Sequence, residues 1–227
     1  MVDFNSYTYP YERVQGAYNQ LKGAEEIPYK VLMYLMNLPD KYGYVPQDDN
    51  NNPRVRLMKY LYYDGANPLG EALPSTSEVT SLLFDGNNPV LNTDELKAKH
   101  PKGYRIYPVN FWLQSETETK SVLKCYMGKT IPQSPFKTTL SLVFEIITNY
   151  SIDTVTKTTA YSRCYAIEQC LIEALHGINM SGVGVIDFNR RTFIDAGTTV
   201  YHDDGQHIFR TVKMSIDWMD SQPVEDL

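Results

Sequence analysis

The chain has 227 residues, of which 42% are hydrophobic and 21% are charged. This composition is typical of a globular protein and excludes a disordered chain of low hydrophobicity and high charge. The formal net charge is −6, and neither lysine nor arginine clusters along any segment, so the attraction that drives binding to a DNA backbone is missing and specific DNA binding is not expected.

The sequence also argues against a membrane protein. No apolar run approaches the roughly 20 residues that a bilayer-spanning helix needs. The first ten residues lack the basic and then apolar pattern of a secretory leader. We therefore predict no membrane partner and synthesis in the cytoplasm. The three cysteines, Cys125, Cys164 and Cys170, cannot all pair, and we interpret them as reduced, buried side chains.

A first helix is predicted from Ile27 to Leu38. Glu25 and Glu26 favour its positive N-terminal end, Pro28 suits the first turn, and Pro39 ends it. Apolar residues occupy nearly every side of this helix. Such a helix must be buried, either within its own fold or against another chain.

A second helix is predicted from Arg54 to Tyr63, with Asn52 as its N-cap and Asp64–Gly65 as its end. Proline and glycine then recur densely between residues 66 and 101, which predicts loops with one short helix at Thr93–Lys99. We interpret residues 1–100 as an N-terminal arm and a helical, loop-rich extension.

This extension is the predicted source of contacts between subunits. Tyrosine is enriched at protein interfaces because its ring buries area while its hydroxyl finds a partner, and the chain has 18 tyrosines. The apolar first helix would expose more apolar surface than a soluble monomer usually tolerates. The interface candidates on the two helices are Tyr29, Leu32, Met33, Leu35, Met36, Met58, Tyr62 and Tyr63.

After Gly103 the apolar residues follow a period of two, which predicts strands at Arg105–Trp112, Ser121–Met127 and Thr138–Ile147. A helix from Thr158 to Gly177 is predicted to be the longest, because its apolar residues recur at intervals of three and four.

Strands resume after this helix. They are predicted at Val183–Phe188, Thr192–Asp195, Thr198–Tyr201 and His207–Trp218. The sequence therefore predicts an α+β fold in which residues 101–227 form a core domain, with an antiparallel sheet packed against one long helix.

The best candidate for a metal site is the cluster His202, Asp203, Asp204 and His207. A hairpin turn explains the same residues, because Asp-Gly between two strands is a turn signal that brings the flanking histidines together. We therefore predict no metal. The pattern at Gly182–Gly184 lies between a helix and a strand, which is the reverse of a phosphate-binding loop. No catalytic, cofactor-binding or metal-binding residue is predicted, and we do not expect an enzyme.

Three segments, Asn52–Asp64, Leu123–Lys129 and Arg210–Trp218, resemble structural proteins from the neck or tail end of tailed bacteriophages. Tail terminators of this kind look like α/β domains with an antiparallel sheet, a long helix and a C-terminal strand, and they assemble as rings, commonly hexamers. The resemblance implies a virion protein without cofactors that caps the tail tube and joins it to the head. Its partners would be copies of itself, a neck or adaptor protein, and tail-tube or sheath proteins. An acidic ring would also let DNA pass without holding it.

Two alternatives remain open. One is a head-completion or adaptor protein beneath the portal, where the resemblance implies twelvefold instead of sixfold symmetry. The other is a hydrolase or metal-binding domain. A particle mass that is a multiple of the 26.0 kDa chain would favour assembly over an enzyme.

Overall fold

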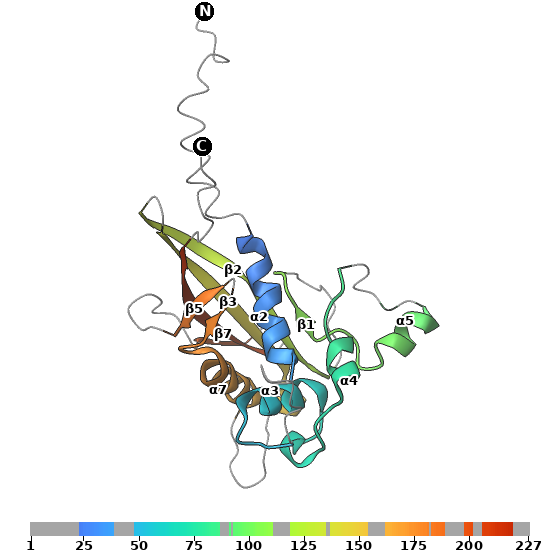
Figure 1. The fold of residues 1–227 in the computed structure, drawn as a ribbon. Helices are drawn as coiled ribbons and strands as arrows, with labels where there is room; N and C mark the ends of the chain where they lie inside the picture. Colours follow the sequence, from blue (N-terminus) through green and yellow to red (C-terminus); the bar gives the residue numbers. More distant parts are fainter. Residues whose placement is uncertain are drawn as a thin grey trace, which may run out of the picture.

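The computed structural model describes residues 23–38, 48–86, 91, 93–110, 119–134, 137–153, 162–181, 183–188, 198–201 and 206–219. Three long antiparallel strands form its centre: β2 (Ser121–Ser134), β3 (Lys137–Asn149) and β7 (His207–Met219). The protein has the predicted α+β fold, with a curled sheet and several helices (Figure 1).

Short strands extend this centre on both sides. The order across the sheet is β1-β2-β3-β7-β5-β4. The strand β6 pairs with β7 at Ile208–Thr211, and β5 pairs with β7 further along, at Ser215 and Ile216. Pairing is antiparallel except between β1 and β2. The short strands are β1 (Ile106–Tyr107), β4 (Asn179–Met180), β5 (Gly184–Asp187) and β6 (Thr198–Tyr201).

The alternation predicted for the long strands is present. On β3, the apolar side chains Leu140, Leu142, Phe144 and Ile146 have no exposed surface. They face the helices α2 (Ile27–Met36), α3 (Pro53–Tyr62) and α7 (Arg163–Leu175), and the buried residues of these helices belong to the same hydrophobic core. One face of the sheet is therefore covered by helices, as the period of two requires.

The expectation of a single long helix on the sheet is not confirmed. The helix α7 has 13 residues, and α2 and α3 have ten each. The helix α7 begins at Arg163 because Ser162 caps it: the Ser162 hydroxyl accepts a hydrogen bond from the backbone N–H of Tyr165 at 3.4 Å. It ends before Gly177, whose φ of 77° places it in the left-handed region that glycine adopts at helix ends.

Local signals account for the shorter helices. Asn52 caps α3 by accepting from the N–H of Arg54 at 2.9 Å, as predicted. The short helix predicted at Thr93–Lys99 is present as α5 (Asp94–Lys99), with Thr93 as its N-cap. The prediction of loop between residues 66 and 93 missed α4 (Thr76–Ser81). Ser75 and Glu78 form a capping box there, and a serine followed three residues later by glutamate is its sequence signature. The remaining short helices are η3 (Ala24–Glu26), η4 (Pro68–Gly70) and α6 (Tyr150–Asp153).

Of the strand predicted at Arg105–Trp112, the described residues 105–110 form only the two residues of β1, and Phe111 and Trp112 lie outside the described residues. Pro108 follows β1 directly, and proline has no N–H to donate to a neighbouring strand. The predicted strand Thr192–Asp195, the cluster residues His202–Asp204 and most of the N-terminal arm lie outside the described residues.

The hydrophobic core runs through both halves of the chain. Val31 of α2, Leu57 of α3 and Val79 of α4 belong to the same buried cluster as Phe144 and Met214 of the sheet. The boundary predicted near residue 100 stays a prediction. The helices before it nevertheless share their core with the sheet after it.

Candidate assembly surface

The first helix supplies five of the eight interface candidates, and the structure divides them by burial. Leu32 and Leu35 have no exposed surface, and Met36 is also buried. Met33 is partly buried against the core, whereas Tyr29 keeps 49% of its surface exposed. Three of the five therefore lie in the core of their own chain.

The second helix supplies the other three. Met58 is fully buried, and Tyr62 is buried with its hydroxyl donating to the carboxylate of Glu78 at 2.6 Å. Burial and the adjacent Glu78 raise the pKa of Tyr62 to about 12. Tyr63 is partly buried and donates to the carbonyl of Ala72 at 2.9 Å. These tyrosines pack and bond within their own chain.

These positions correct the premise of the interface prediction. The apolar helix Ile27–Leu38 is covered by its own sheet, because sheet and helix each have an apolar face that must be buried and they bury each other. Leu32, Leu35, Met36, Met58 and Tyr62 are thus core residues. Whether Tyr29, Met33 or Tyr63 contacts a second subunit stays a prediction.

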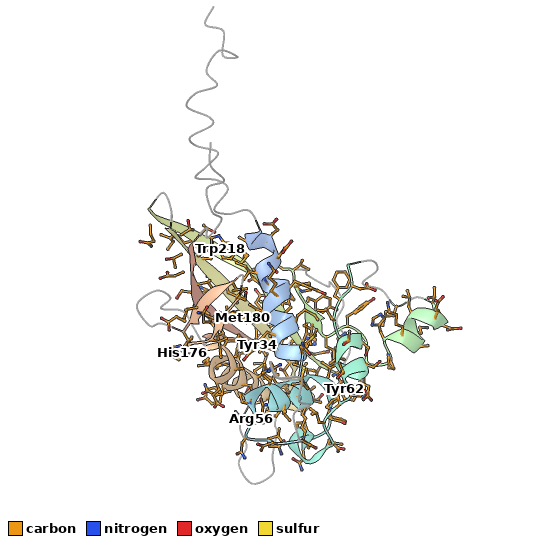
Figure 2. All side chains as sticks on the ribbon, viewed as in Figure 1. Tyr34, Arg56, Tyr62, His176, Met180 and Trp218 are labelled. Atoms are coloured by element: carbon orange, nitrogen blue, oxygen red, sulfur yellow. The ribbon has the colours of Figure 1, made fainter. Side chains whose placement is uncertain are left out.

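The junction between α2 and α3 is held by a further pair that was not predicted. The guanidinium of Arg54 lies 4.5 Å from the ring centroid of Tyr34, and its Nη2 donates to the carbonyl of Asn37. Figure 2 shows Tyr34 on α2 close to α3. A cation over an aromatic ring is favourable, so this contact orients the first helix against the second.

Two buried arginines fix the end of α3, and sequence reasoning missed both. Arg105 makes a bidentate ion pair with Asp64, at 2.6 and 2.8 Å, and donates to the carbonyl of Leu61 at 2.9 Å. Positive charge is favoured at a helix C-terminus, where carbonyl groups lack partners within the helix. The segment after α3 is therefore tied to the start of β1.

Arg163, at the start of α7, binds the same segment after α3. Its Nη1 donates to the carbonyl of Tyr63 at 2.6 Å and its Nη2 to that of Gly65 at 2.5 Å. The side chain has no exposed surface, and this burial lowers its pKa. An arginine with no exposed surface can be recognised only from the tertiary structure, because the arginines of a helix are usually at the protein surface.

The main candidate for assembly is the outer edge of β2, the edge that faces away from β3. The strand has 14 residues, and β1 pairs with that edge at Leu123 and Lys124 alone. Within the described part of the chain, no strand pairs with the same edge from Cys125 to Ser134. Gly128, Lys129 and Thr130 are exposed there. An unpaired strand edge offers N–H and C=O groups to another strand.

This edge is shaped by a bulge. Gly128 and Lys129 together stand opposite Ser141 of β3, because the register moves from Met127 opposite Leu142 to Thr130 opposite Leu140. A Cβ on Gly128 would come within 2.7 Å of the Val143 side chain, so glycine is needed for the strands to approach. Bulges and exposed lysines on edge strands limit indiscriminate pairing.

A polar group on the face of the sheet opposite the helices supports this edge. The hydroxyl of Tyr126 donates to the carboxylate of Glu145 at 2.5 Å, and the buried Lys124 lies 3.6 Å from the same carboxylate. Burial and the carboxylate raise the pKa of Tyr126. Cross-strand pairs of this kind stabilise a sheet. These contacts with β3 therefore hold β2 in place along the stretch where the outer edge of β2 has no partner strand.

The groups considered for chemistry are also placed. Cys125, Cys164 and Cys170 are buried and unpaired, and burial raises the pKa of Cys164 and of Cys170 to about 12. Both thiols are therefore protonated at neutral pH. Among the residues that the structure describes, no three His, Cys, Asp or Glu side chains gather in a way that could hold a metal ion.

The described residues include no helix long and apolar enough to cross a bilayer. The fold is thus an α+β fold in which, among the described residues, the outer edge of β2 has no partner strand beyond Lys124. A family model named YomW matches residues 55–215. The chain belongs to the YomW family, which is phage-associated. No curated protein and no solved structure matches it.

Proposed function

We propose that this protein is a structural component of the phage virion, located at the neck or tail end, and that it assembles into a ring. In this role it resembles a tail terminator, which caps the tail tube and joins it to the head. Its partners are further copies of itself, a neck or adaptor protein, and tail-tube or sheath proteins. It has no catalytic role.

The open edge of β2, in a chain of a phage-associated family, is the observation that carries this proposal. A sheet with an unpaired edge can extend into a neighbouring subunit by main-chain hydrogen bonds. The net charge of −6 is compatible with this role, because an acidic ring repels the DNA that passes through it.

The test is the mass and shape of the purified protein. Light scattering over a range of concentrations should give a multiple of 26.0 kDa, and negative-stain electron microscopy should show closed rings. Sixfold class averages fit a tail-side ring, and twelvefold averages place the protein beneath the portal instead. A protein that stays monomeric at high concentration and makes no particles would overturn the proposal.

A further inference from the structure

Within the described residues, two strands with an unpaired edge, β2 and β6, run in opposite directions. Because β2 is antiparallel to β3 and β3 to β7, β2 and β7 run the same way. The strand β6 is antiparallel to β7, so it runs opposite to β2. Within the described residues, β6 pairs with β7 alone and its other edge is open. A second copy placed head to tail would therefore bring β6 beside β2 in the antiparallel sense.

The hydrogen bonds of β2 show which of its residues direct their backbone groups to the unpaired edge. The N–H of Leu123 donates to the carbonyl of Arg105 on the β1 side, and in an antiparallel strand alternate residues direct their backbone groups to the same side. Cys125 and Met127 thus face the open edge. The bulge adds one residue to β2, so Thr130 is the next residue to face it.

Both ends of this stretch are closed. The pairing of β1 with Leu123 and Lys124 blocks the N-terminal end. Two residues after Thr130, Pro132 takes the same side, and proline has no N–H to donate. The usable edge therefore runs from Cys125 to about Thr130, which is long enough for the four residues of β6.

The register of β6 relative to β2 determines how far a neighbouring copy must be shifted along the strand direction. Through β7 and β3, Thr198–Tyr201 lies level with Ser121–Lys124 of β2, and β1 already occupies part of that stretch. The neighbour's β6 must therefore shift along β2 past Lys124. A closed ring of strands needs such a stagger, because its strands tilt relative to the axis.

From these relations we infer that the edge Cys125–Thr130 of β2 binds β6 of a second copy of this chain, in an antiparallel and staggered pair. The inference rests on the ring proposed above and names the contact that closes it. The contact is heterologous, since two different edges meet, and heterologous contacts that return on themselves generate rings.

The first test removes one edge donor. Thr130→Pro deletes an N–H that faces the open edge and leaves the ladder with β3 intact, whereas Thr130→Val keeps the N–H and serves as the control. Half-assembly of Thr130→Pro should need about tenfold more protein, or be lost, because a hydrogen bond is removed at every contact in the ring. Circular dichroism and a thermal melt would verify that both variants fold.

The second test places a disulfide across the contact. Thr130→Cys is combined with Thr199→Cys or with Val200→Cys, and since successive strand residues face opposite sides, only one combination should cross-link. Oxidation should give a ladder of covalent oligomers ending at the ring. The native cysteines are buried, so they do not compete.

The outcomes separate this inference from the ring itself. If the unmodified protein is monomeric, both fail. If rings form but Thr130→Pro assembles like Thr130→Val and neither cysteine pair cross-links, the ring stands and this contact is wrong. A disulfide dimer from Thr130→Cys alone would show that two β2 edges meet, which also overturns the inference.

Discussion

At the scale of single residues, the structure depends on charged side chains that are buried in the interior of the protein. Among the described residues, Arg163 is the largest fully buried side chain, and Arg105 is buried near enough to act on its charge. The two arginines come from sequence positions far apart and meet at the segment that follows α3. A buried cation is costly unless it is hydrogen-bonded, so their carbonyl and carboxylate partners are required.

We predict that Arg163→Lys lowers the free energy of unfolding by about 1–3 kcal/mol. The ammonium group of lysine cannot reach the carbonyls of both Tyr63 and Gly65, as the planar guanidinium does. A buried carbonyl that loses its hydrogen-bond partner destabilises the fold by about 1–3 kcal/mol. Arg56→Lys is the control, since Arg56 pairs with Glu173 at partly exposed positions and should change stability by less than about 1 kcal/mol. Urea unfolding measures both. Equal losses would contradict the role of Arg163.

The cysteines make a second residue-scale prediction. Folding raises the pKa of Cys164 and of Cys170 from 9.0 to about 12, chiefly through burial. Their contribution to stability is fully present below pH 9 and is lost as the pH rises toward 12, because the unfolded state then releases protons that the folded state retains. Denaturant unfolding between pH 8 and 11 should therefore show falling stability, with a shallower fall in Cys170→Ala.

A thiol reagent checks the burial itself. At pH 8 the native protein should leave its three cysteines unmodified, and all three should react after unfolding. A thiol that reacts as fast in the native protein as in the unfolded one would contradict this placement.

At the scale of elements, the first helix shows how one sequence pattern can serve two structures. An apolar surface on every side signals burial, and both a sheet of the same chain and a neighbouring subunit can supply the cover. The structure places the helix on its own sheet. Only Tyr29, of its interface candidates, remains largely exposed.

Two substitutions in α2 test this placement. Leu32→Ala should lower the free energy of unfolding by about 2–5 kcal/mol, because it leaves a cavity in the core. Tyr29→Ala should change the stability of the folded chain by about 0.5 kcal/mol or less, as exposed positions usually do. Thermal melts at low protein concentration compare the two without assembly. If Leu32→Ala proved harmless there, the helix would not belong to the core.

At the scale of the whole molecule, the shared core makes a prediction about cooperativity. Helices from the first hundred residues and the sheet from the rest bury each other, so neither part can keep its apolar face covered alone. Calorimetry of the full chain should give one transition whose calorimetric and van't Hoff enthalpies agree. Two separate transitions would instead support independent domains on either side of residue 100.

The sequence by itself determined the α+β class, the long strands β3 and β7, the cap of α3 and the presence of the short helix α5. These features follow from local rules, since the period of two, an Asn-Pro start and a Gly stop act within a few residues. It also contained the Ser75–Glu78 signature of α4, which the density of proline and glycine around it concealed. The YomW match agrees with the phage resemblance at the level of a phage-associated family.

Only the tertiary structure decided what covers the apolar helix, why Arg105 and Arg163 are buried, and which edge of the sheet stays open. Each depends on residues tens of positions apart meeting in space, and no local pattern encodes such meetings. The open edge is the clearest case, because alternation in β2 predicts a strand equally well whether one or two neighbours pair with it. Within the described residues this edge is unpaired beyond Lys124 because β1 has only two residues and ends before Pro108.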